Sequence, residues 1–244
     1  MSEQTYFDIN KFPKDWGIIV FPISMSRIGN AQSPQACIDA MRFFLDKMTA
    51  NRVGANFIYS EGLYMNFERD AFETKNRFAN TAVSHMGGVR NLFLKSSREL
   101  QIDSALSFES WFQMYLSYKD FFSAFKSVRK LYEDDADFRN YVASDAKAAG
   151  KELTEEQLSF YLEEHTFAYL LMNRQLRLRN DFVNDREQWV LLAYPGMPLL
   201  GQVYLVQKDP LGINDDSNPY KGQYNLEKKV FIPYLKVDLE NPNL

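Results

Sequence analysis

Short apolar segments alternate with helical patterns along the first half of the chain. A strand is expected where a brief apolar run lies between turn residues, and a helix where apolar side chains recur every three or four positions. Pro34 suits the first turn of one predicted helix, and Gly87-Gly88 suits the end of another. The pattern predicts strands over 17–23, 56–60 and 90–95 and helices over 34–49 and 66–86. Alternation of this kind is typical of a parallel α/β sheet.

The second half of the chain is patterned less regularly. Amphipathic helical spacing runs over 107–149 and is interrupted by Gly150. Thr154 to Gln157 (TEEQ) form a capping box, in which the Thr and Gln side chains satisfy the first backbone N–H groups of a helix. The remaining prediction is a helix over 154–175, strands over 189–194, 202–206 and 229–232, and a loop over 208–225. We therefore expect one domain over 1–244, with 208–244 mostly loop around a short strand.

Composition agrees with a globular domain that is not membrane-spanning. The 244 residues are 45% hydrophobic and 25% charged, and one large domain accommodates this length. The single cysteine, Cys37, excludes an internal disulfide and is typical of a reducing compartment. The sequence contains no cationic leader and no apolar run of about 18 residues. We expect a cytoplasmic protein, and no dimerisation helix is evident, so we expect a monomer.

Charge is distributed unevenly, although the net charge is only −4. No acidic residue occurs between Glu73 and Glu99, whereas five basic residues do. These are Lys75, Arg77, Arg90, Lys95 and Arg98. Such a segment is either ordinary solvated surface or a local phosphate-binding face on an otherwise acidic protein.

Several common kinds of catalytic site are missing from the sequence. Two histidines and one cysteine do not provide a typical zinc site, and HExxH and CxxC motifs are absent. No P-loop or GxGxxG motif is present to bind nucleotide phosphates, and no GxSxG motif marks an α/β-hydrolase. We therefore expect no metal and no cofactor.

Polar side chains from three predicted elements are candidates for a common site. Ser24 follows the strand 17–23 and Tyr194 ends the strand 189–194, and ligands of open α/β sheets bind at the carboxyl ends of strands. On the helix from 154, His165, Tyr169 and Asn173 lie on one mostly apolar stripe. Taken singly, each is also explained as a core or turn residue. Together, a hydroxyl nucleophile and two tyrosines indicate acyl transfer.

The order of short motifs resembles that of the tRNA-dependent cyclodipeptide synthases, which make diketopiperazines from two aminoacyl-tRNAs. The resemblance covers about 18–206. Its motifs are Ile23-Ser24 after the first strand, the long helical segment 118–138, the helix start Thr154–Leu158 leading to Tyr169–Asn173, and Ala193-Tyr194-Pro195. The pair Tyr194-Pro195 resembles the subfamily in which a proline follows the catalytic tyrosine. The family resembles the catalytic domain of class I tyrosyl- and tryptophanyl-tRNA synthetases, which implies a single Rossmann-type domain, with a mostly parallel sheet and helices on both faces.

The resemblance also implies roles for particular residues. Ser24 would take the first aminoacyl group from its tRNA as an ester, in an ATP-independent ping-pong reaction. Tyr169 and Asn173 would hold the ammonium group, and Tyr194 would relay a proton during ring closure. Substrate binding is assigned to Pro22, Arg27, His165 and Pro195. The basic residues of 75–98 overlap the tRNA-binding helix of the family, so the expected partners are two aminoacyl-tRNAs bound in sequence.

The chain departs from the family pattern at several of these positions. Asn173 stands where the family has a glutamate; either it serves as a neutral acceptor, or Glu164 or Asp181 replaces it, or the alignment is displaced. Pro22 replaces a glycine, and Arg27 replaces an asparagine found in one subfamily.

Three further alternatives stay open. Ser26 is close enough to Ser24 to be the nucleophile. A chain that lacks the glutamate at 173 is also compatible with an RNA-binding relative without catalytic activity. A serine hydrolase is the third possibility, with His165 serving alone as the base.

Overall fold

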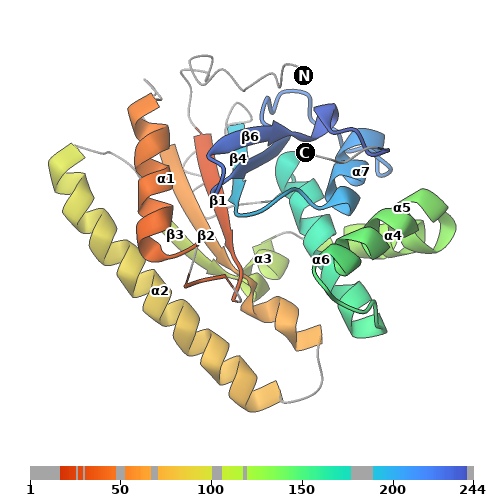
Figure 1. The fold of residues 1–244 in the computed structure, drawn as a ribbon, viewed down its shortest axis with the longest axis horizontal. Helices are drawn as coiled ribbons and strands as arrows, with labels where there is room; N and C mark the ends of the chain where they lie inside the picture. Colours follow the sequence, from red (N-terminus) through yellow and green to blue (C-terminus); the bar gives the residue numbers. More distant parts are fainter. Residues whose placement is uncertain are drawn as a thin grey trace.

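The protein is a single α/β domain built on one six-stranded sheet (Figure 1). The computed structural model describes residues 17–25, 27–29, 31–47, 53–66, 71–100, 106–117, 120–176 and 189–240. The strands are β1 (Gly17–Ile23), β2 (Val53–Tyr59), β3 (Leu106–Ser110), β4 (Trp189–Tyr194), β5 (Gly222–Asn225) and β6 (Val230–Pro233). Their order is β3-β2-β1-β4-β5-β6, and all neighbours are parallel except β5 and β6. This confirms the predicted fold class.

Helices cover both faces of the sheet. Two helices pack on one face: α1 (Pro34–Lys47) and α2 (Ala71–Leu100). The other face carries α3 (Trp111–Ser117), α4 (Phe121–Asp134), α5 (Ala136–Ala148), α6 (Glu155–Met172) and α7 (Leu200–Lys208). Short 3-10 helices, η2 (Ser60–Asn66) and η3 (Tyr234–Lys236), follow β2 and β6. Figure 1 shows α2 as a long outer helix on the opposite side of the molecule from α4 and α5.

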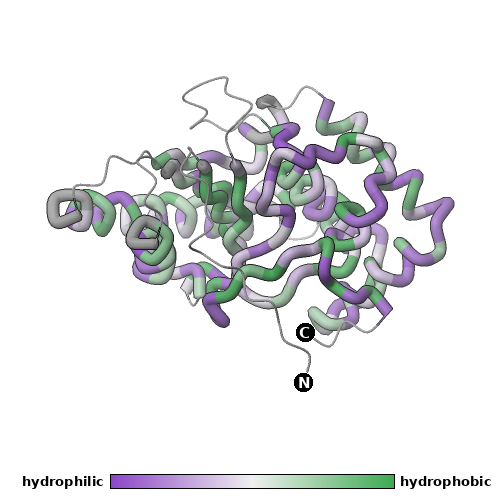
Figure 2. Tube along the Cα trace, turned by 90° about the horizontal axis from the view of Figure 1, so that it is seen from above, coloured by the Kyte–Doolittle hydropathy of each residue, from purple (hydrophilic) through white to green (hydrophobic). Residues whose placement is uncertain are grey.

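The alternation of side chains along β1 builds both layers of the core. Ile19 and Phe21 pack with α1 and α2, whereas Ile18 and Val20 belong to the cluster formed with α4 to α7. All four side chains are buried, because a central parallel strand is covered by helices on both faces. Figure 2 shows the hydrophobic segments concentrated in the interior of the molecule, with hydrophilic segments at the periphery.

Two local predictions are confirmed residue by residue. Pro34 is the first residue of α1. Thr154 is the N-cap of α6, with its side chain accepting a hydrogen bond from the backbone N–H of Gln157 at 3.3 Å. Gly150, in the left-handed region at φ 66°, separates α5 from this cap. Both signals depend only on neighbours in sequence, which is why the sequence reveals them.

The strand predicted over 90–95 is wrong, because α2 continues through this segment to Leu100. Gly88 does not end the helix; it allows α1 to approach, since a Cβ at this position would lie 2.8 Å from the Pro34 ring. The third strand is instead β3, Leu106–Ser110, which overlaps the start of the segment 107–149 predicted as mostly helical.

The strand predicted over 202–206 is also wrong, because these residues lie in α7. The helix is started by a distant side chain: the Asp145 carboxylate accepts hydrogen bonds from the backbone N–H groups of Leu200 at 2.7 Å and Gly201 at 2.9 Å. A carboxylate at a helix N-terminus satisfies the free N–H groups and complements the helix dipole. The predicted loop over 208–225 ends in β5, and β6 lies at the predicted last strand.

Substitution of the two glycines of α2 separates packing from helix propensity. Gly87→Ala is expected to stabilise the protein by about 0.5–1 kcal/mol, because alanine favours a helix and a Cβ there meets no atom within 4 Å. Gly88→Ala is expected to gain nothing or to lose stability, because its Cβ presses on Pro34. Denaturant unfolding of both variants measures the difference, and equal stabilisation would contradict the close α1–α2 contact.

Candidate active site

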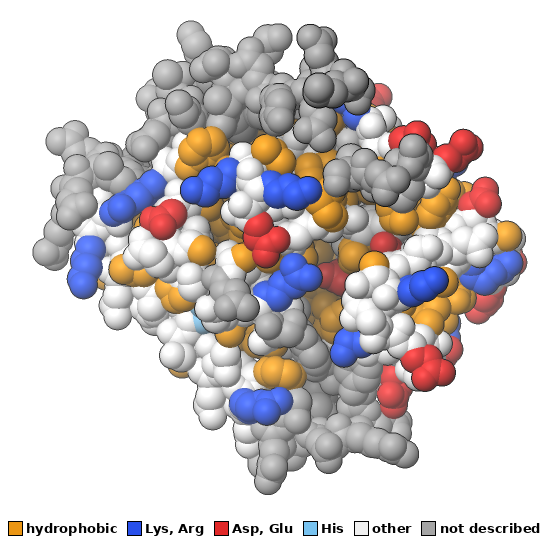
Figure 3. All heavy atoms as spheres, in the orientation of Figure 1, with side chains coloured by type: hydrophobic (Ala, Val, Ile, Leu, Met, Phe, Trp, Pro, Cys, Tyr) orange, Lys and Arg blue, Asp and Glu red, His pale blue; other side chains and the backbone are white. Residues whose placement is uncertain are grey.

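A cavity of about 340 Å³ opens where the strand order of the sheet reverses. This point lies between β1 and β4, which run parallel and carry their following residues to the same edge. Ligands of doubly wound sheets bind at this point. Pro22 and Ser24 line the cavity from β1, and Leu192 and Tyr194 line it from β4. Figure 3 shows the surface hollowed between the sheet and the helices α4 to α6, with hydrophobic and acidic atoms in the hollow.

The remaining lining comes mainly from α6 and from the segments that follow β2, β3 and β4. Its apolar members are Leu63, Trp111, Ala149, Phe160, Phe167, Ala168, Pro195, Met197 and Leu199. Its polar and charged members are Arg27, Ser60, Lys151, Gln157, Tyr161, Glu164, Gln202 and Gln223. The exposed surface of the cavity is mostly apolar, although polar and charged side chains are nearly as numerous in its lining. Small-molecule sites typically combine the two.

Ser24 is the first residue after β1, and its half-buried side chain lines the cavity. The chain turns immediately after it, with the N–H of Arg27 donating to the carbonyl of Ser24 at 3.0 Å. This strand-to-turn position presents a short hydroxyl side chain to the edge of the sheet, as the sequence predicts. Ser26, the alternative nucleophile, lies outside the described residues.

The predicted residues Pro22, Arg27 and Pro195 meet Tyr194 at the same cavity. The Arg27 guanidinium lies 5.8 Å from the centroid of the Tyr194 ring and donates to the carbonyl of Pro195 at 3.2 Å. Gly196 follows with φ 86°, and a Cβ there would lie 2.9 Å from the Arg27 guanidinium. One cation thus joins the segment after β1 to the segment after β4.

Glu164 is the acidic side chain among the described residues that line the cavity. Burial raises the pKa of this carboxyl, and the nearby charge of Asp145 adds to the rise, while His165 and Arg27 oppose it. A carboxylate in an apolar cavity gains most when a cation is bound beside it, because desolvation penalises the unpaired charge. Glu164 is therefore suited to bind a ligand ammonium group. The sequence indicated it only as one of two substitutes for the glutamate missing at 173.

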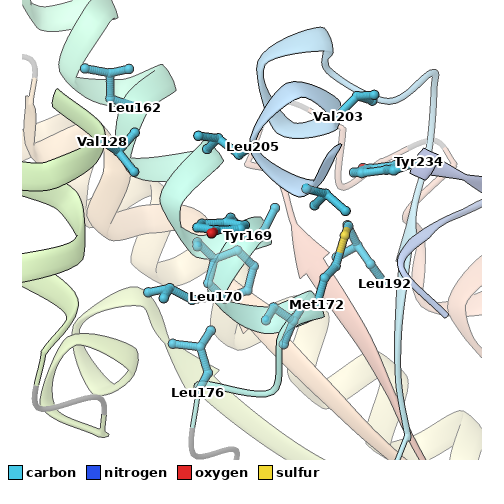
Figure 4. Packing of buried hydrophobic residues seen from close by; sticks show 14 of the residues in the cluster. Val128, Leu162, Tyr169, Leu170, Met172, Leu176, Leu192, Val203, Leu205 and Tyr234 are labelled. Carbon is cyan, nitrogen blue, oxygen red and sulfur yellow. The ribbon is translucent and has the colours of Figure 1, made fainter. Parts of the chain in front are cut away.

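Two of the predicted site residues, Tyr169 on α6 and Asn173 at its C-cap, lie away from the cavity lining. Tyr169 donates from its hydroxyl to Asp209, and Asn173 accepts from the backbone N–H of Asp215 at 3.1 Å. Both side chains are fully buried and fasten the segment after α7 to α6. Figure 4 shows Tyr169 among Leu170, Met172 and Leu205, within the hydrophobic core.

His165 is also buried away from the lining, beneath the start of α7. Its Nε2 lies 3.3 Å from the Asp145 carboxylate, and a Cβ at Gly201 would lie only 2.5 Å from the same ring nitrogen. The substrate-binding role predicted for His165 is thus not matched by its position. The stripe predicted from sequence, His165, Tyr169 and Asn173, does not face the cavity. From Tyr161 to Met172, α6 is buried on nearly every side, so hydrophobic spacing does not mark the face that lines the cavity.

The structure places the five predicted basic positions on one helix, α2. Arg77, Arg90 and Lys95 are exposed, and the side chains of Lys75 and Arg98 lie outside the described residues. Arg77 and Lys95 are five helical turns apart and therefore lie on the same flank, at 3.6 residues per turn. Arg90 falls on the other flank.

No helix in the described part of the chain is long and apolar enough to cross a membrane. Within the same residues, no group of three or more His, Cys, Asp or Glu side chains is arranged to hold a metal ion.

Glu164→Gln is expected to stabilise the free protein at neutral pH. Because the pKa of Glu164 is raised in the folded protein, its ionisation opposes folding, and this cost appears as the pH rises above the pKa of an exposed glutamate. The Tm of the variant should exceed that of the parent by a margin that grows between about pH 4 and pH 7. Glu156→Gln, on the exposed first turn of α6, is the control. A margin independent of pH would contradict the desolvation of Glu164.

No protein-family model and no curated protein matches this chain. Its fold is nevertheless similar to solved structures of cyclodipeptide synthases. That from Bacillus thermoamylovorans is 16% identical over 85% of this chain and 86% of its own, with a TM-score of 0.52. That from Staphylococcus haemolyticus is 10% identical over 85% and 87%, with a TM-score of 0.51.

A third similar structure is a Mycobacterium tuberculosis protein, described as demonstrating that cyclodipeptide synthetases are related to type I tRNA synthetases. It is 13% identical over 76% of this chain and 75% of its own, with a TM-score of 0.50. The chain therefore shares the fold of these cyclodipeptide synthase structures.

Proposed function

We propose that this chain is a tRNA-dependent cyclodipeptide synthase that joins two aminoacyl groups through esters of Ser24. One observation carries the proposal: Ser24, Tyr194 and Glu164 line a single cavity at the reversal of strand order. A nucleophile, a proton-relay group and an acceptor for an ammonium group are what the reaction requires. The shared fold supports the same conclusion.

In the first step, Ser24 Oγ attacks the carbonyl carbon of an aminoacyl-tRNA ester. The new bond joins Oγ to that carbon, and the bond to the ribose oxygen breaks. The free α-amine of the substrate takes the Oγ proton and passes it to the leaving ribose oxygen, so no separate histidine is needed. The exchange of one ester for another releases little energy, and the protein contributes mainly by positioning.

Glu164 holds the amino group of the aminoacyl-enzyme as an ammonium. The apolar cavity strengthens this charge-assisted pair, and the position of Glu164 within the lining supports it in this role rather than Asn173. Leu63, Trp111 and Phe167 add apolar surface to the cavity, which suits a hydrophobic first side chain.

In the second stage, the amino group of the aminoacyl-enzyme gives up a proton and attacks the ester carbonyl of a second aminoacyl-tRNA. A new amide bond forms, the bond to the ribose oxygen breaks, and that oxygen leaves with the proton, so that a dipeptidyl-enzyme remains on Ser24. The free amine of that dipeptide then attacks the remaining ester carbonyl and closes a six-membered ring. Tyr194 relays the proton from the attacking amine to Oγ, which leaves as free Ser24. The position of Tyr194 at the end of β4, in the same cavity lining as Ser24, supports this role.

A serine hydrolase is less well supported by the same geometry. Such an enzyme needs a base beside the nucleophile. The described residues lining the cavity include no histidine, and His165 is buried against Asp145.

Ser24→Ala tests the reaction and the nucleophile together. The parent, expressed in a bacterial host, should release a cyclic dipeptide that mass spectrometry detects in the medium. The variant should release at least about a thousandfold less, because the covalent route is lost. Its fold should be retained, because a half-buried hydroxyl contributes little packing. Ser123→Ala, the same substitution on the exposed surface of α4, is the control. A soluble, folded parent without any cyclic dipeptide would contradict the proposal.

Reversal of two charges on α2 tests the tRNA-binding face. Arg77→Glu with Lys95→Glu should weaken binding of aminoacyl-tRNA about tenfold or more and lower the log–log salt slope by about two, one per lost phosphate contact. Binding is measured at several salt concentrations with Ser24→Ala in the background, which prevents turnover.

The matched control for the α2 variant reverses Lys130 and Lys147, which are exposed on α4 and α5. It changes the net charge equally on the opposite side of the molecule. If both double variants weaken binding alike, the effect reflects net charge and not a binding face on α2.

A further inference from the structure

We propose that Gln32 is the positioning residue of Ser24: its side-chain amide holds the backbone from Pro22 to Ser24, and His85 of α2 holds Gln32 in turn. The inference rests on the proposed function, because the step that Gln32 serves is the acylation of Ser24. It concerns residues behind the cavity, since neither Gln32 nor His85 belongs to the lining.

Gln32 makes two hydrogen bonds to the segment that carries the nucleophile. Its Oε1 accepts from the backbone N–H of Ser24 at 2.9 Å, and its Nε2 donates to the carbonyl of Pro22. The side chain is fully buried although a glutamine is mostly exposed in proteins. Both polar ends of the amide are thus committed to one short stretch of backbone.

The two backbone groups that Gln32 bonds, the Pro22 carbonyl and the Ser24 N–H, lie where β1 has no neighbouring strand to bond them. The carbonyl of one residue and the N–H of the second residue after it point to the same edge of an extended strand, where a neighbouring strand normally bonds them. The pairing of β1 with β4 ends at Val20 and Leu192. The amide of Gln32 takes the place of a strand neighbour beyond this point, so that Pro22 to Ser24 stay extended while the sheet opens.

The opposite edge of the same segment is held by β2 and η2. The backbone of Ile23 pairs with Tyr59, and the Ser60 hydroxyl donates to the carbonyl of Ile23 at 3.0 Å. The backbone of residues 22, 23 and 24 is therefore bonded on alternate edges. With both edges fixed, the direction of the Ser24 side chain is set by the backbone.

Gln32 is itself fixed by a buried histidine. His85 Nε2 lies 2.7 Å from the carbonyl oxygen of Gln32, and Nδ1 lies 2.9 Å from the Tyr59 hydroxyl. A carbonyl only accepts, so Nε2 carries the proton and Nδ1 accepts from Tyr59. Burial lowers the pKa of His85, which keeps the ring in this neutral form. The thiol of Cys37 also donates to the Gln32 carbonyl, at 3.7 Å.

His85 connects the nucleophile to the helix of the proposed tRNA-binding face. It lies on the buried side of α2, and Arg77 and Lys95 lie on an exposed flank of the same helix. A contact chain therefore runs from α2 through His85 and Gln32 to Ser24. A displacement of α2 toward or away from β1 changes the position of Gln32 and with it that of the nucleophile.

Single-turnover acylation by aminoacyl-tRNA tests the role of Gln32. Gln32→Met keeps the size of the side chain and removes both hydrogen bonds. We expect the rate constant for acylation of Ser24 at saturating aminoacyl-tRNA to fall about ten- to a hundredfold, because small displacements of a nucleophile cost this much. The concentration for half-saturation should stay unchanged, because α2 and the cavity lining are intact.

The matched control is Gln35→Met, the same substitution on the exposed face of α1, where the amide donates to Asp39 at 2.7 Å. A merely structural role of Gln32 would lower the folded fraction and hence the amplitude of acylation, not its rate constant. An unchanged rate constant in Gln32→Met would overturn the inference. A parent chain that forms no acyl-enzyme would instead contradict the proposed function.

Gln32→Glu supplies a second readout. A protonated carboxyl has one donor and one acceptor, as the amide has, whereas a carboxylate has only acceptors and repels the Pro22 carbonyl. The acylation rate constant, divided by that of the parent at each pH, should therefore rise as the pH falls from 8 to 6. The titratable groups around Gln32, which are His85, Cys37 and Tyr59, are common to both proteins. A ratio independent of pH would contradict the hydrogen-bonding role.

Discussion

The site depends on the separation of β1 from β4 at their carboxyl ends. Up to Val20 and Leu192 the two strands are joined by a parallel ladder, and beyond this pair each needs other partners for its backbone. Gln32 bonds the edge of β1 that β4 has left, while the Arg27 guanidinium donates to the carbonyl of Pro195, just after β4. Side chains thus bond the backbone of both segments where the ladder has ended, and residues of both segments line the cavity.

Much of the fold is predictable because its signals are local. The cap of α6 needs only Thr154 and Gln157, and the apolar run of β1 needs only its own residues. The wrong predictions depend on distant partners. Asp145 starts α7 from 55 residues away. Gly88 packs against Pro34 within α2, although a pair of glycines in the sequence resembles the end of a helix. Short apolar runs do not distinguish a buried strand from a buried helix without such contacts.

The candidate site divides in the same way. Ser24 and Tyr194 are predictable from the rule that ligands bind at strand ends, and the structure brings both to one cavity. The α6 residues are not, because a helix buried on nearly every side shows no stripe that marks the face toward the cavity. Glu164 is distinguished by being an acidic residue in the cavity lining, and Gln32 by being a buried amide. Both properties depend on the three-dimensional surroundings of the residue and cannot be read from the sequence.

The burial of Cys37 has a consequence for chemical selectivity. Activated esters react readily with thiolates, and a protein that handles them is exposed to the formation of thioesters at the wrong residue. The one sulfhydryl of this chain is fully buried between α1 and the sheet, and burial raises its pKa to about 12. It therefore stays a neutral thiol, out of reach of a bulky ester. In the proposed reaction, acyl groups would be left to oxygen nucleophiles.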